Sequence, residues 1–144
     1  MTGNDKFIGT WQLLSMVNES DSVENHLPFG KNVSGLLIYT EDGYMSAQLG
    51  QSGRNKFISS DFRYGTKDEI FSAFNGYISY FGTYEIDEAK SLVVHDVQMS
   101  MYPNWEGTRQ KRYFSFKNDL LILKATPVLF NEQLYTPTLT WQKV

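Results

Sequence analysis

Residues 35–49, GLLIYTEDGYMSAQL, form the stretch of sequence that decides the fold. Two runs rich in apolar and aromatic residues, 35–40 and 44–49, flank the short turn Glu41-Asp42-Gly43. β-branched and aromatic residues favour strands, and Asp-Gly between two such runs is typical of a tight hairpin. The stretch therefore predicts a pair of antiparallel strands.

The same alternation of extended runs and turns continues along the chain. We expect strands at residues 7–17, 35–40, 44–49, 81–87, 91–100, 108–117, 120–125 and 137–143, and long loops at 18–33 and 50–65. Eight strands that follow one another mostly as hairpins most simply close into an antiparallel up-and-down barrel. The sequence therefore predicts an all-β protein.

One short helix is expected between the third and fourth strands, from Thr66 to about Ser79. Thr66 and Glu69 match the Thr-x-x-Glu pattern of a capping box. Apolar residues then recur at helical spacing and predict a buried face that covers one end of the barrel and contacts either core alone or also a ligand. This face comprises Ile70, Phe74, Tyr77, Ile78 and Phe81.

Composition narrows the classes of protein. The chain has 144 residues, enough for one domain over 1–144, and no cysteine for disulfides, thiol chemistry or cysteine metal ligands. We find no secretion signal and no apolar run that spans a membrane, so we expect a cytoplasmic protein. The net charge of -3 argues against nucleic acid as a partner.

The turns also predict which side chains face the barrel interior. A turn at 88–90 places Thr83 opposite His95 and Phe81 opposite Val97, and a turn at 118–119 places Arg112 opposite Ala125. A single β-bulge would shift this assignment. The predicted interior set on the central strands is Val93, His95, Val97, Met99, Gln110, Arg112, Phe114 and Phe116.

Two polar residues stand in this apolar set, and both are candidates for ligand contact or catalysis. A buried arginine needs a partner, so Arg112 is expected to pair either with Glu85 or with an anionic ligand group. His95 either is a core histidine bonded to Thr83 or a tyrosine, or contacts a ligand and acts as a general acid–base. His26, the only other histidine, lies in a polar loop, so neither a metal nor a cofactor is expected.

The loop Tyr102-Pro103-Asn104-Trp105 is predicted to form a rim or lid, because an aromatic loop is costly to leave in water. Tyr39, beside the hairpin turn, is expected to line a barrel mouth. The full set of expected ligand contacts is His95, Arg112, Phe81, Val97, Met99, Phe114, Tyr39, Tyr102 and Trp105.

Several motifs together resemble the bacterial and fungal lipocalin-like domain family. They are Gly9-Thr10-Trp11, Pro28-Phe29-Gly30, residues 35–40 and 42–48, residues 80–85, Val94-His95, residues 103–108, residues 112–114, and Trp141. The resemblance implies a calycin-type barrel with a cavity for a small molecule and no defined activity. It also implies a structural role for Trp11 and Trp141, with Trp11 closing one barrel end. Similar chains carry Arg where Lys143 stands here, and a lysine would stack on Trp11 less rigidly.

Of three possible functions, we favour the first and keep the second as its main alternative. The first is a binder of a small apolar or aromatic molecule whose polar or anionic group is held inside the barrel. The second is a cofactor-independent isomerase, cyclase or hydro-lyase that uses His95 as acid–base, Arg112 as anion holder and a tyrosine as second donor. The third is a packed barrel acting as an interaction module, with a homodimer patch expected at Tyr84, Ile86, Val94 and Tyr113.

Overall fold

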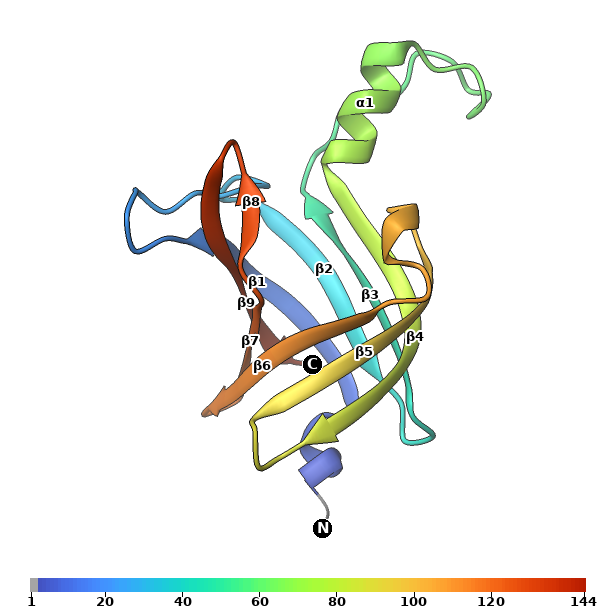
Figure 1. The fold of residues 1–144 in the computed structure, drawn as a ribbon. Coiled ribbons are helices and arrows are strands. Elements are labelled where there is room, and N and C mark those ends of the chain that lie inside the picture. The colour runs from blue at the N-terminus through green and yellow to red at the C-terminus, as the bar shows by residue number, and fades with distance from the viewer. Residues whose placement is uncertain (1–2) are drawn as a thin grey trace.

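The computed structural model describes residues 3–144, which form a closed antiparallel barrel (Figure 1). Each barrel strand pairs with the next in the chain, and the last pairs with the first, which confirms the predicted eight-stranded barrel. The barrel strands are β1 (Gly9–Glu19), β2 (Val33–Tyr39), β3 (Tyr44–Gln51), β4 (Tyr77–Asp87), β5 (Leu92–Ser100), β6 (Arg109–Lys117), β7 (Leu120–Ala125) and β9 (Gln133–Lys143).

The hairpin of residues 35–49 forms as predicted. β2 and β3 pair from Tyr39 opposite Met45 to Val33 opposite Gln51. Gly43 takes a φ of 95° in the turn, a conformation that residues with a side chain rarely adopt. The Asp-Gly signal therefore fixes the register of the pair and places Leu37 and Ala47 together inside the barrel.

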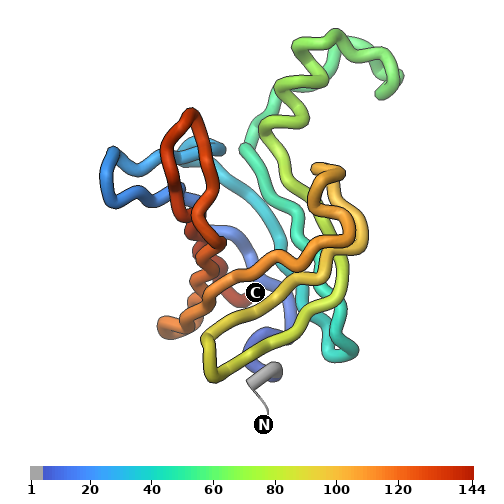
Figure 2. Tube along the Cα trace, viewed as in Figure 1, coloured from blue at the N-terminus to red at the C-terminus, as the bar shows by residue number. Residues whose placement is uncertain are grey.

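One end of the barrel is closed by aromatic side chains. Phe7 precedes β1, although the sequence placed it in the first strand, and its ring packs edge-on against Tyr39, Phe114 and Phe116. The short 3₁₀ helix Gly3–Lys6 leads into this end. The hairpin of β9 with the short strand β8 (Val128–Phe130), which was not predicted, and helix α1 (Lys67–Asn75) lie at the opposite, open end (Figure 2).

Helix α1 lies between the third and fourth strands, as predicted, but it is not part of the core. Thr66 and Glu69 form the expected capping box, and the helix ends before Gly76. No residue of α1 is buried, and the helix projects beyond the barrel (Figure 1). Three of the five residues assigned to its apolar face, Tyr77, Ile78 and Phe81, belong to β4 instead, because pairing with β3 extends to Gly50 opposite Tyr77.

The predicted register between β4 and β5 is wrong by one residue. The turn comprises four residues, 88–91, because Ser91 adopts a φ of 50° and β5 begins only at Leu92. His95 therefore lies opposite Tyr84, not Thr83. Since strand side chains alternate between faces, this shift turns Tyr80 and Tyr84 inward and Phe81 and Glu85 outward.

A β-bulge interrupts the same strand pair nearer the open end. Phe81 lies opposite Met99 and the next residue, Gly82, opposite Val97, so β5 carries one extra residue here. Val97 faces the interior as predicted, whereas Met99 is 60% exposed on the outside. A Cβ at Gly82 would lie 1.8 Å from the carbonyl oxygen of Asp96, so only glycine fits the bulge.

The register of β6 and β7 agrees with the prediction. Arg112 lies opposite Ala125, and Phe114 lies opposite Leu123. Burial alternates along β6, and the less exposed set is the predicted one, Gln110, Arg112, Phe114 and Phe116. No helix in residues 3–144 is long and apolar enough to cross a membrane.

Candidate functional site

A cavity of about 240 Å³ lies inside the barrel. Most of its wall is apolar, with a polar group formed by Tyr80 on β4, His95 on β5, and Gln110 and Arg112 on β6. An eight-stranded barrel of this kind is wide enough for one small ligand. The other lining residues are Met16, Asn18, Leu37, Ala47, Leu49, Ile78, Trp105, Leu123, Ala125, Thr126, Val128, Pro137, Leu139 and Trp141.

The open end holds a second hollow of about 550 Å³, which forms the mouth. It shares Met16, Ile78 and Trp105 with the inner cavity, so these side chains stand where the two meet. Tyr102 lines the mouth, and its ring packs edge-on against Trp105. The aromatic loop thus lies at the rim, as the sequence predicts.

His95 is 1% exposed and holds two tyrosines at once. Its Nε2 lies 2.6 Å from the hydroxyl of Tyr39 on β2, and its Nδ1 lies 2.9 Å from the hydroxyl of Tyr80. Of the partners considered from sequence, the structure selects tyrosine rather than Thr83. The three side chains form a continuous chain of hydrogen bonds from the closed end of the barrel to the cavity.

Burial keeps all three groups of this chain uncharged. Desolvation, helped by the nearby positive charge of Arg112, lowers the pKa of His95 well below its ordinary value. Desolvation also raises the pKa of the Tyr39 and Tyr80 phenols, while Arg112 opposes that rise. At neutral pH the site therefore presents a neutral imidazole, two phenols and one guanidinium.

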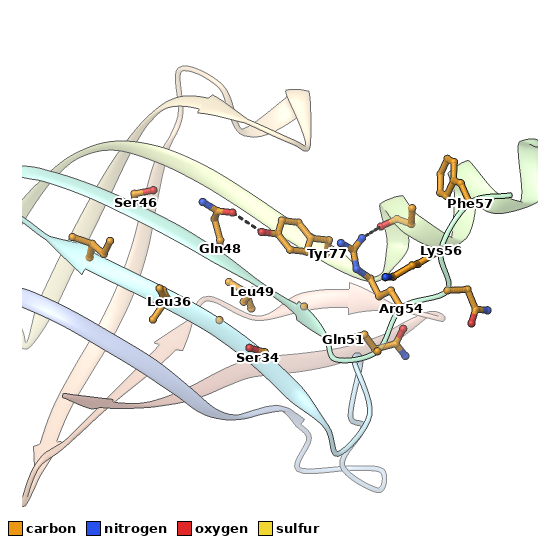
Figure 3. A pocket seen from close by; sticks show the side chains of 16 residues that line it. Ser34, Leu36, Ser46, Gln48, Leu49, Gln51, Arg54, Lys56, Phe57 and Tyr77 are labelled. Atoms are coloured by element: carbon orange, nitrogen blue, oxygen red, sulfur yellow. Dashed lines mark hydrogen bonds between the residues drawn. The ribbon is translucent and has the colours of Figure 1, made fainter. Parts of the chain in front are cut away.

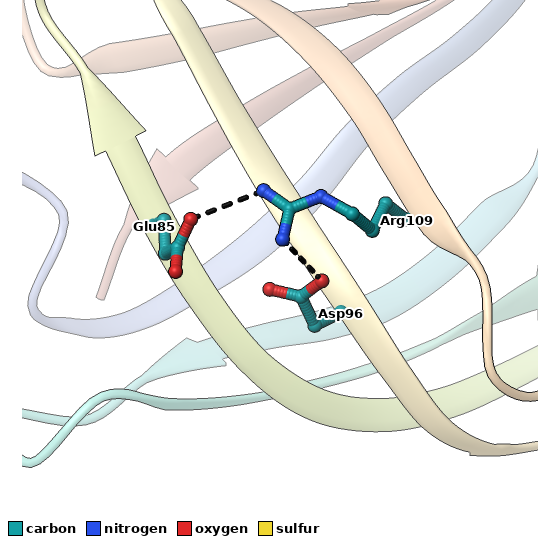
Figure 4. Close-up of polar contacts among 3 residues, drawn as sticks. All are labelled: Glu85, Asp96 and Arg109. Carbon is teal, nitrogen blue, oxygen red and sulfur yellow. Dashed lines mark hydrogen bonds and ion pairs between the residues drawn. The ribbon is translucent and has the colours of Figure 1, made fainter.

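Arg112 is the cation of this site, and it does not pair with Glu85. Arg112 lies beside Tyr80 and His95, and one of its nitrogens donates to the backbone oxygen of Lys111 across 2.9 Å. Glu85 lies outside the barrel because of the register shift. There Arg109 bonds both Glu85, at 3.1 Å, and Asp96, at 3.0 Å (Figure 4).

Within residues 3–144, no carboxylate forms an ion pair with Arg112. Of the two outcomes that the sequence left open for this arginine, pairing with Glu85 is therefore wrong. The guanidinium remains available to a ligand that enters the cavity.

Comparison with known proteins agrees with this architecture. Residues 8–144 match the lipocalin-like domain family. The chain belongs to this family. One relative with a similar sequence is the 4'-hydroxy-3'-methoxypropiophenone carrier protein of Aspergillus oryzae (strain ATCC 42149 / RIB 40). It is 34% identical over 107 residues, which cover 69% of this chain and 96% of the relative.

Solved structures similar to this lipocalin-like domain include two mutants of the fluorescent protein UnaG. They show 12% identity and TM-scores of 0.43 and 0.42, and each alignment covers 97% of both chains. At this distance neither bears on the function of the domain.

The structure gathers some of the predicted ligand contacts and separates others. His95, Arg112 and Trp105 line the inner cavity, and Tyr102 lines the mouth. Tyr39 lies behind His95 rather than at a barrel mouth. The remaining predicted contacts stand outside both linings: Phe81 and Met99 are exposed on the outer face, and Val97 and Phe114 pack in the core.

Tyr80 is a cavity side chain that is absent from the ligand contacts predicted from the sequence. It lines the cavity, bonds His95 and packs edge-on against Trp105. Tyr80 points inward because Ser91 has a positive φ, which lengthens the turn after β4 by one residue. Serine has no strong preference for that conformation, so the sequence carries little warning.

The two tryptophans assigned structural roles differ in their surroundings. The Nε1 of Trp11 donates to the backbone oxygen of Phe7 across 2.8 Å, and Lys143 lies over its ring at the closed end. Trp141 is also buried, but it lines the cavity, and its Nε1 has no hydrogen-bond partner within residues 3–144. The same holds for Oδ1 of Asn18, another cavity residue.

A larger hollow of about 800 Å³ lies on the outside of the lipocalin-like barrel, between β2, β3 and the segment that leads to α1 (Figure 3). Tyr77 donates to Gln48 here, and the guanidinium of Arg54 lies 4.6 Å from the centre of the Tyr77 ring. Three of its polar side chains are thus already engaged with one another, and much of its wall is exposed chain. The inner cavity is the better candidate site.

Proposed function

We propose that this lipocalin-like domain binds a small aromatic molecule inside the barrel, with an oxygen of the ligand held by Tyr80 and Arg112. The observation that carries the proposal is the half-buried cationic side chain of Arg112, which forms no ion pair with a carboxylate of residues 3–144, in a cavity whose other walls are largely apolar. A guanidinium in such surroundings is stabilised by an oxygen that accepts its hydrogen bonds.

The relative supports the same ligand class. It is named as a carrier of 4'-hydroxy-3'-methoxypropiophenone, an aromatic ketone with three oxygens, and its similarity extends over most of both chains. A cavity of about 240 Å³ that opens through an aromatic rim suits a compact aromatic molecule better than a long lipid chain. We therefore expect a binding or carrier role.

Calorimetric titration with 4'-hydroxy-3'-methoxypropiophenone tests the proposal. Propylbenzene, which keeps the ring and carbon chain but lacks oxygen, serves as the matched ligand and is expected to bind more weakly. Replacing Arg112→Met should weaken binding of the ketone about tenfold, since a charged hydrogen bond contributes about 1.5–3 kcal/mol and each 1.4 kcal/mol is tenfold.

Arg109→Met is the control variant, because it removes the same charge from the outer face of the same strand. We expect it to bind the ketone like the wild type. Absence of binding to the wild type, or equal weakening by both substitutions, would contradict the proposal.

The second candidate function is catalysis without a cofactor, and the chain from Tyr39 through His95 to Tyr80 favours it. Both ring nitrogens of His95 are occupied, so the group that reaches a ligand directly is Tyr80, not His95 as the sequence suggested. Tyr80, whose oxygen is held by His95, would donate its proton to the carbonyl oxygen while water removes a hydrogen from the adjacent carbon, and the enol would return the proton to Tyr80 when it reverts to the ketone.

Incubating propiophenone with the protein in D₂O checks this alternative. Exchange of the hydrogens beside the carbonyl at a rate above that in buffer, lost in Tyr80→Phe, would support an enzyme. Exchange at the buffer rate would leave the carrier function.

Two observations argue against the hypothesis of a packed barrel that acts as an interaction module. The barrel interior contains a cavity and is not packed solid. The expected dimer patch is also disrupted, because Tyr84 points inward, donates to the backbone oxygen of Thr40, and is 8% exposed. Val94 is 7% exposed, which leaves Tyr113 as the exposed aromatic residue of that group.

A further inference from the structure

The hydrogen bonds among Tyr39, His95 and Tyr80 run in one direction, and Tyr39 determines which. Tyr39 is 1% exposed, and within residues 3–144 its hydroxyl has a single partner, Nε2 of His95. A buried hydroxyl proton without an acceptor costs about 1–3 kcal/mol. Tyr39 therefore donates to Nε2, which must be the nitrogen without a hydrogen.

The proton of the His95 ring then lies on Nδ1. A neutral imidazole carries one N–H and one acceptor nitrogen. With Nε2 accepting from Tyr39, Nδ1–H donates to the oxygen of Tyr80 across 2.9 Å. In a doubly protonated ring, Nε2 would also carry a hydrogen, so it could not accept from Tyr39 and the buried hydroxyl proton would be unpaired.

The hydroxyl proton of Tyr80 consequently points away from His95. The oxygen of Tyr80 accepts from the imidazole, and Arg112 beside it has donors but no acceptor. No acceptor for this proton is found in the part of the chain that the structure describes. Because Tyr80 and Arg112 lie beside each other and both line the cavity, both can offer hydrogens to a ligand there.

We propose that Tyr39, which does not contact the ligand, fixes Tyr80 as a hydrogen-bond donor through His95, so that this end of the cavity selects a carbonyl oxygen over a hydroxyl group. The inference rests on the proposed function and adds to it. It states that an aromatic ketone lies with its carbonyl against Tyr80 and Arg112, and its ring against the apolar wall.

Propiophenone and 1-phenylpropan-1-ol test this polarity, since they share one carbon skeleton and differ in the carbonyl or hydroxyl group. The alcohol oxygen can accept from Tyr80, but neither Arg112, which has no acceptor, nor the Tyr80 oxygen, which already accepts from His95, takes the alcohol proton in return. We expect the wild type to bind the ketone about tenfold more tightly, because an unpaired buried donor costs about 1–3 kcal/mol and 1.4 kcal/mol is tenfold.

Replacing Tyr39→Phe should reduce this preference several-fold without removing any ligand contact. Nε2 no longer receives a hydrogen bond, so the proton can move to it and Nδ1 can accept from Tyr80. The oxygen of Tyr80 is then free to accept from the alcohol. Tyr84→Phe is the matched control, because Tyr84 packs against Tyr39 at a centroid distance of 4.7 Å but bonds Thr40 instead of His95.

The outcomes separate the two proposals. If neither compound binds the wild type, the proposed function fails and this inference fails with it. If both bind equally, the inference fails alone, and the side-chain oxygen of Gln110 becomes the candidate acceptor for the alcohol. If Tyr39→Phe keeps the wild-type ratio of ketone to alcohol affinity, as the control Tyr84→Phe is expected to do, then Tyr39 does not determine which group Tyr80 selects.

A measurement on the unaltered protein avoids any loss of folding in the variants. The nitrogen chemical shifts of the His95 ring distinguish a protonated Nδ1 from a bare one. We expect a protonated Nδ1 and a bare Nε2 in the ligand-free protein. The opposite tautomer would overturn the inference.

Discussion

The ammonium group of Lys143 lies 4.7 Å from the centre of the Trp11 ring, at the closed end of the barrel. The same nitrogen donates to the backbone oxygen of Ile8, so the last residue of β9 is tied to the chain just before β1, the strand with which β9 pairs. Lys143 thus stabilises this end of the barrel with one cation–π contact and one hydrogen bond.

Replacing Lys143→Met should reduce the free energy of unfolding by about 1–2 kcal/mol. The substitution keeps an unbranched apolar side chain over Trp11 but removes the cation–π contact, worth about 0.5–1 kcal/mol, and a hydrogen bond of about 1 kcal/mol. Urea denaturation measures the change, with Lys117→Met on the exposed end of β6 as control. Equal stability of wild type and Lys143→Met would show that the contact contributes nothing.

The two buried tryptophans should respond differently to replacement by phenylalanine. Both substitutions lose similar volume, but Trp11→Phe also leaves the backbone oxygen of Phe7 without its hydrogen bond, whereas Trp141→Phe removes an N–H that has no partner. We expect Trp11→Phe to be the more destabilising by about 1–3 kcal/mol in urea denaturation. A larger loss for Trp141→Phe would mean that its N–H is bonded in solution.

Burial of His95 should make stability depend on pH. The unfolded chain protonates this residue near its ordinary pKa of 6.5, while the folded protein, whose His95 pKa is lowered by desolvation and then by Arg112, takes the proton only at lower pH. Between these two pKa values the unfolded state binds more protons. The contribution of neutral His95 to the free energy of unfolding is therefore complete above pH 6.5. It is lost as the pH falls, by up to about 1.4 kcal/mol per pH unit.

The variant His95→Gln removes this titration and provides the comparison. We expect the difference in unfolding free energy between wild type and variant to be constant above about pH 7.5 and to shrink from pH 6.5 to 5. Chemical denaturation at a series of pH values measures it. A difference that stays constant over the whole range is incompatible with a buried, neutral His95.

Much of the fold could be predicted because its turns carry strong local signals. Asp42-Gly43 fixes the pairing of β2 with β3, and the two-residue turn at Asn118 and Asp119 fixes that of β6 with β7. The turn at 88–91 carries no such signal, because its residue of positive φ is Ser91. One residue of error there inverted every side chain of β4, since the period of a strand is two.

The helix shows a conflict between local and long-range effects. The capping box at Thr66 and Glu69 is local, so the start of α1 was predicted correctly. Its end was not, because the apolar residues from Tyr77 to Phe81 fit both a helical face and a strand. Pairing with β3, which depends on the whole barrel, decides in favour of the strand.

In the candidate site, the sequence predicts two of the polar residues but not the hydrogen bonds between them and the tyrosines. His95 and Arg112 stand out because they are polar residues on an apolar face, and both line the cavity. The partner of His95 on β2 is 56 residues away in the chain. With 9 tyrosines in the sequence, no local pattern distinguishes Tyr39 and Tyr80 from tyrosines that only pack.

The bulge at Gly82 gives a further prediction. In Gly82→Ala the added Cβ would meet the Asp96 carbonyl oxygen at 1.8 Å, so the backbone of β4 or β5 must shift. We expect a loss of about 1–3 kcal/mol in the free energy of unfolding, the range for overpacked sites. The neighbouring substitution Thr83→Ala adds no atom and serves as the control. A Gly82→Ala variant as stable as Thr83→Ala would mean that the bulge is not needed.

Loss of the helix cap should affect α1 but leave the barrel unchanged. In Thr66→Ala the backbone N–H of Glu69 loses the hydrogen bond that it donates to the Thr66 hydroxyl, which costs about 0.5–2 kcal/mol of helix stability. Because no residue of α1 is buried, tertiary packing does little to offset that loss. Hydrogen exchange should therefore become faster in α1, with unchanged protection in the barrel strands and an unchanged melting temperature. Ser72→Ala, within the same helix but away from its cap, should not accelerate exchange. A melting temperature that falls together with the faster exchange would show that α1 and the barrel unfold as one unit.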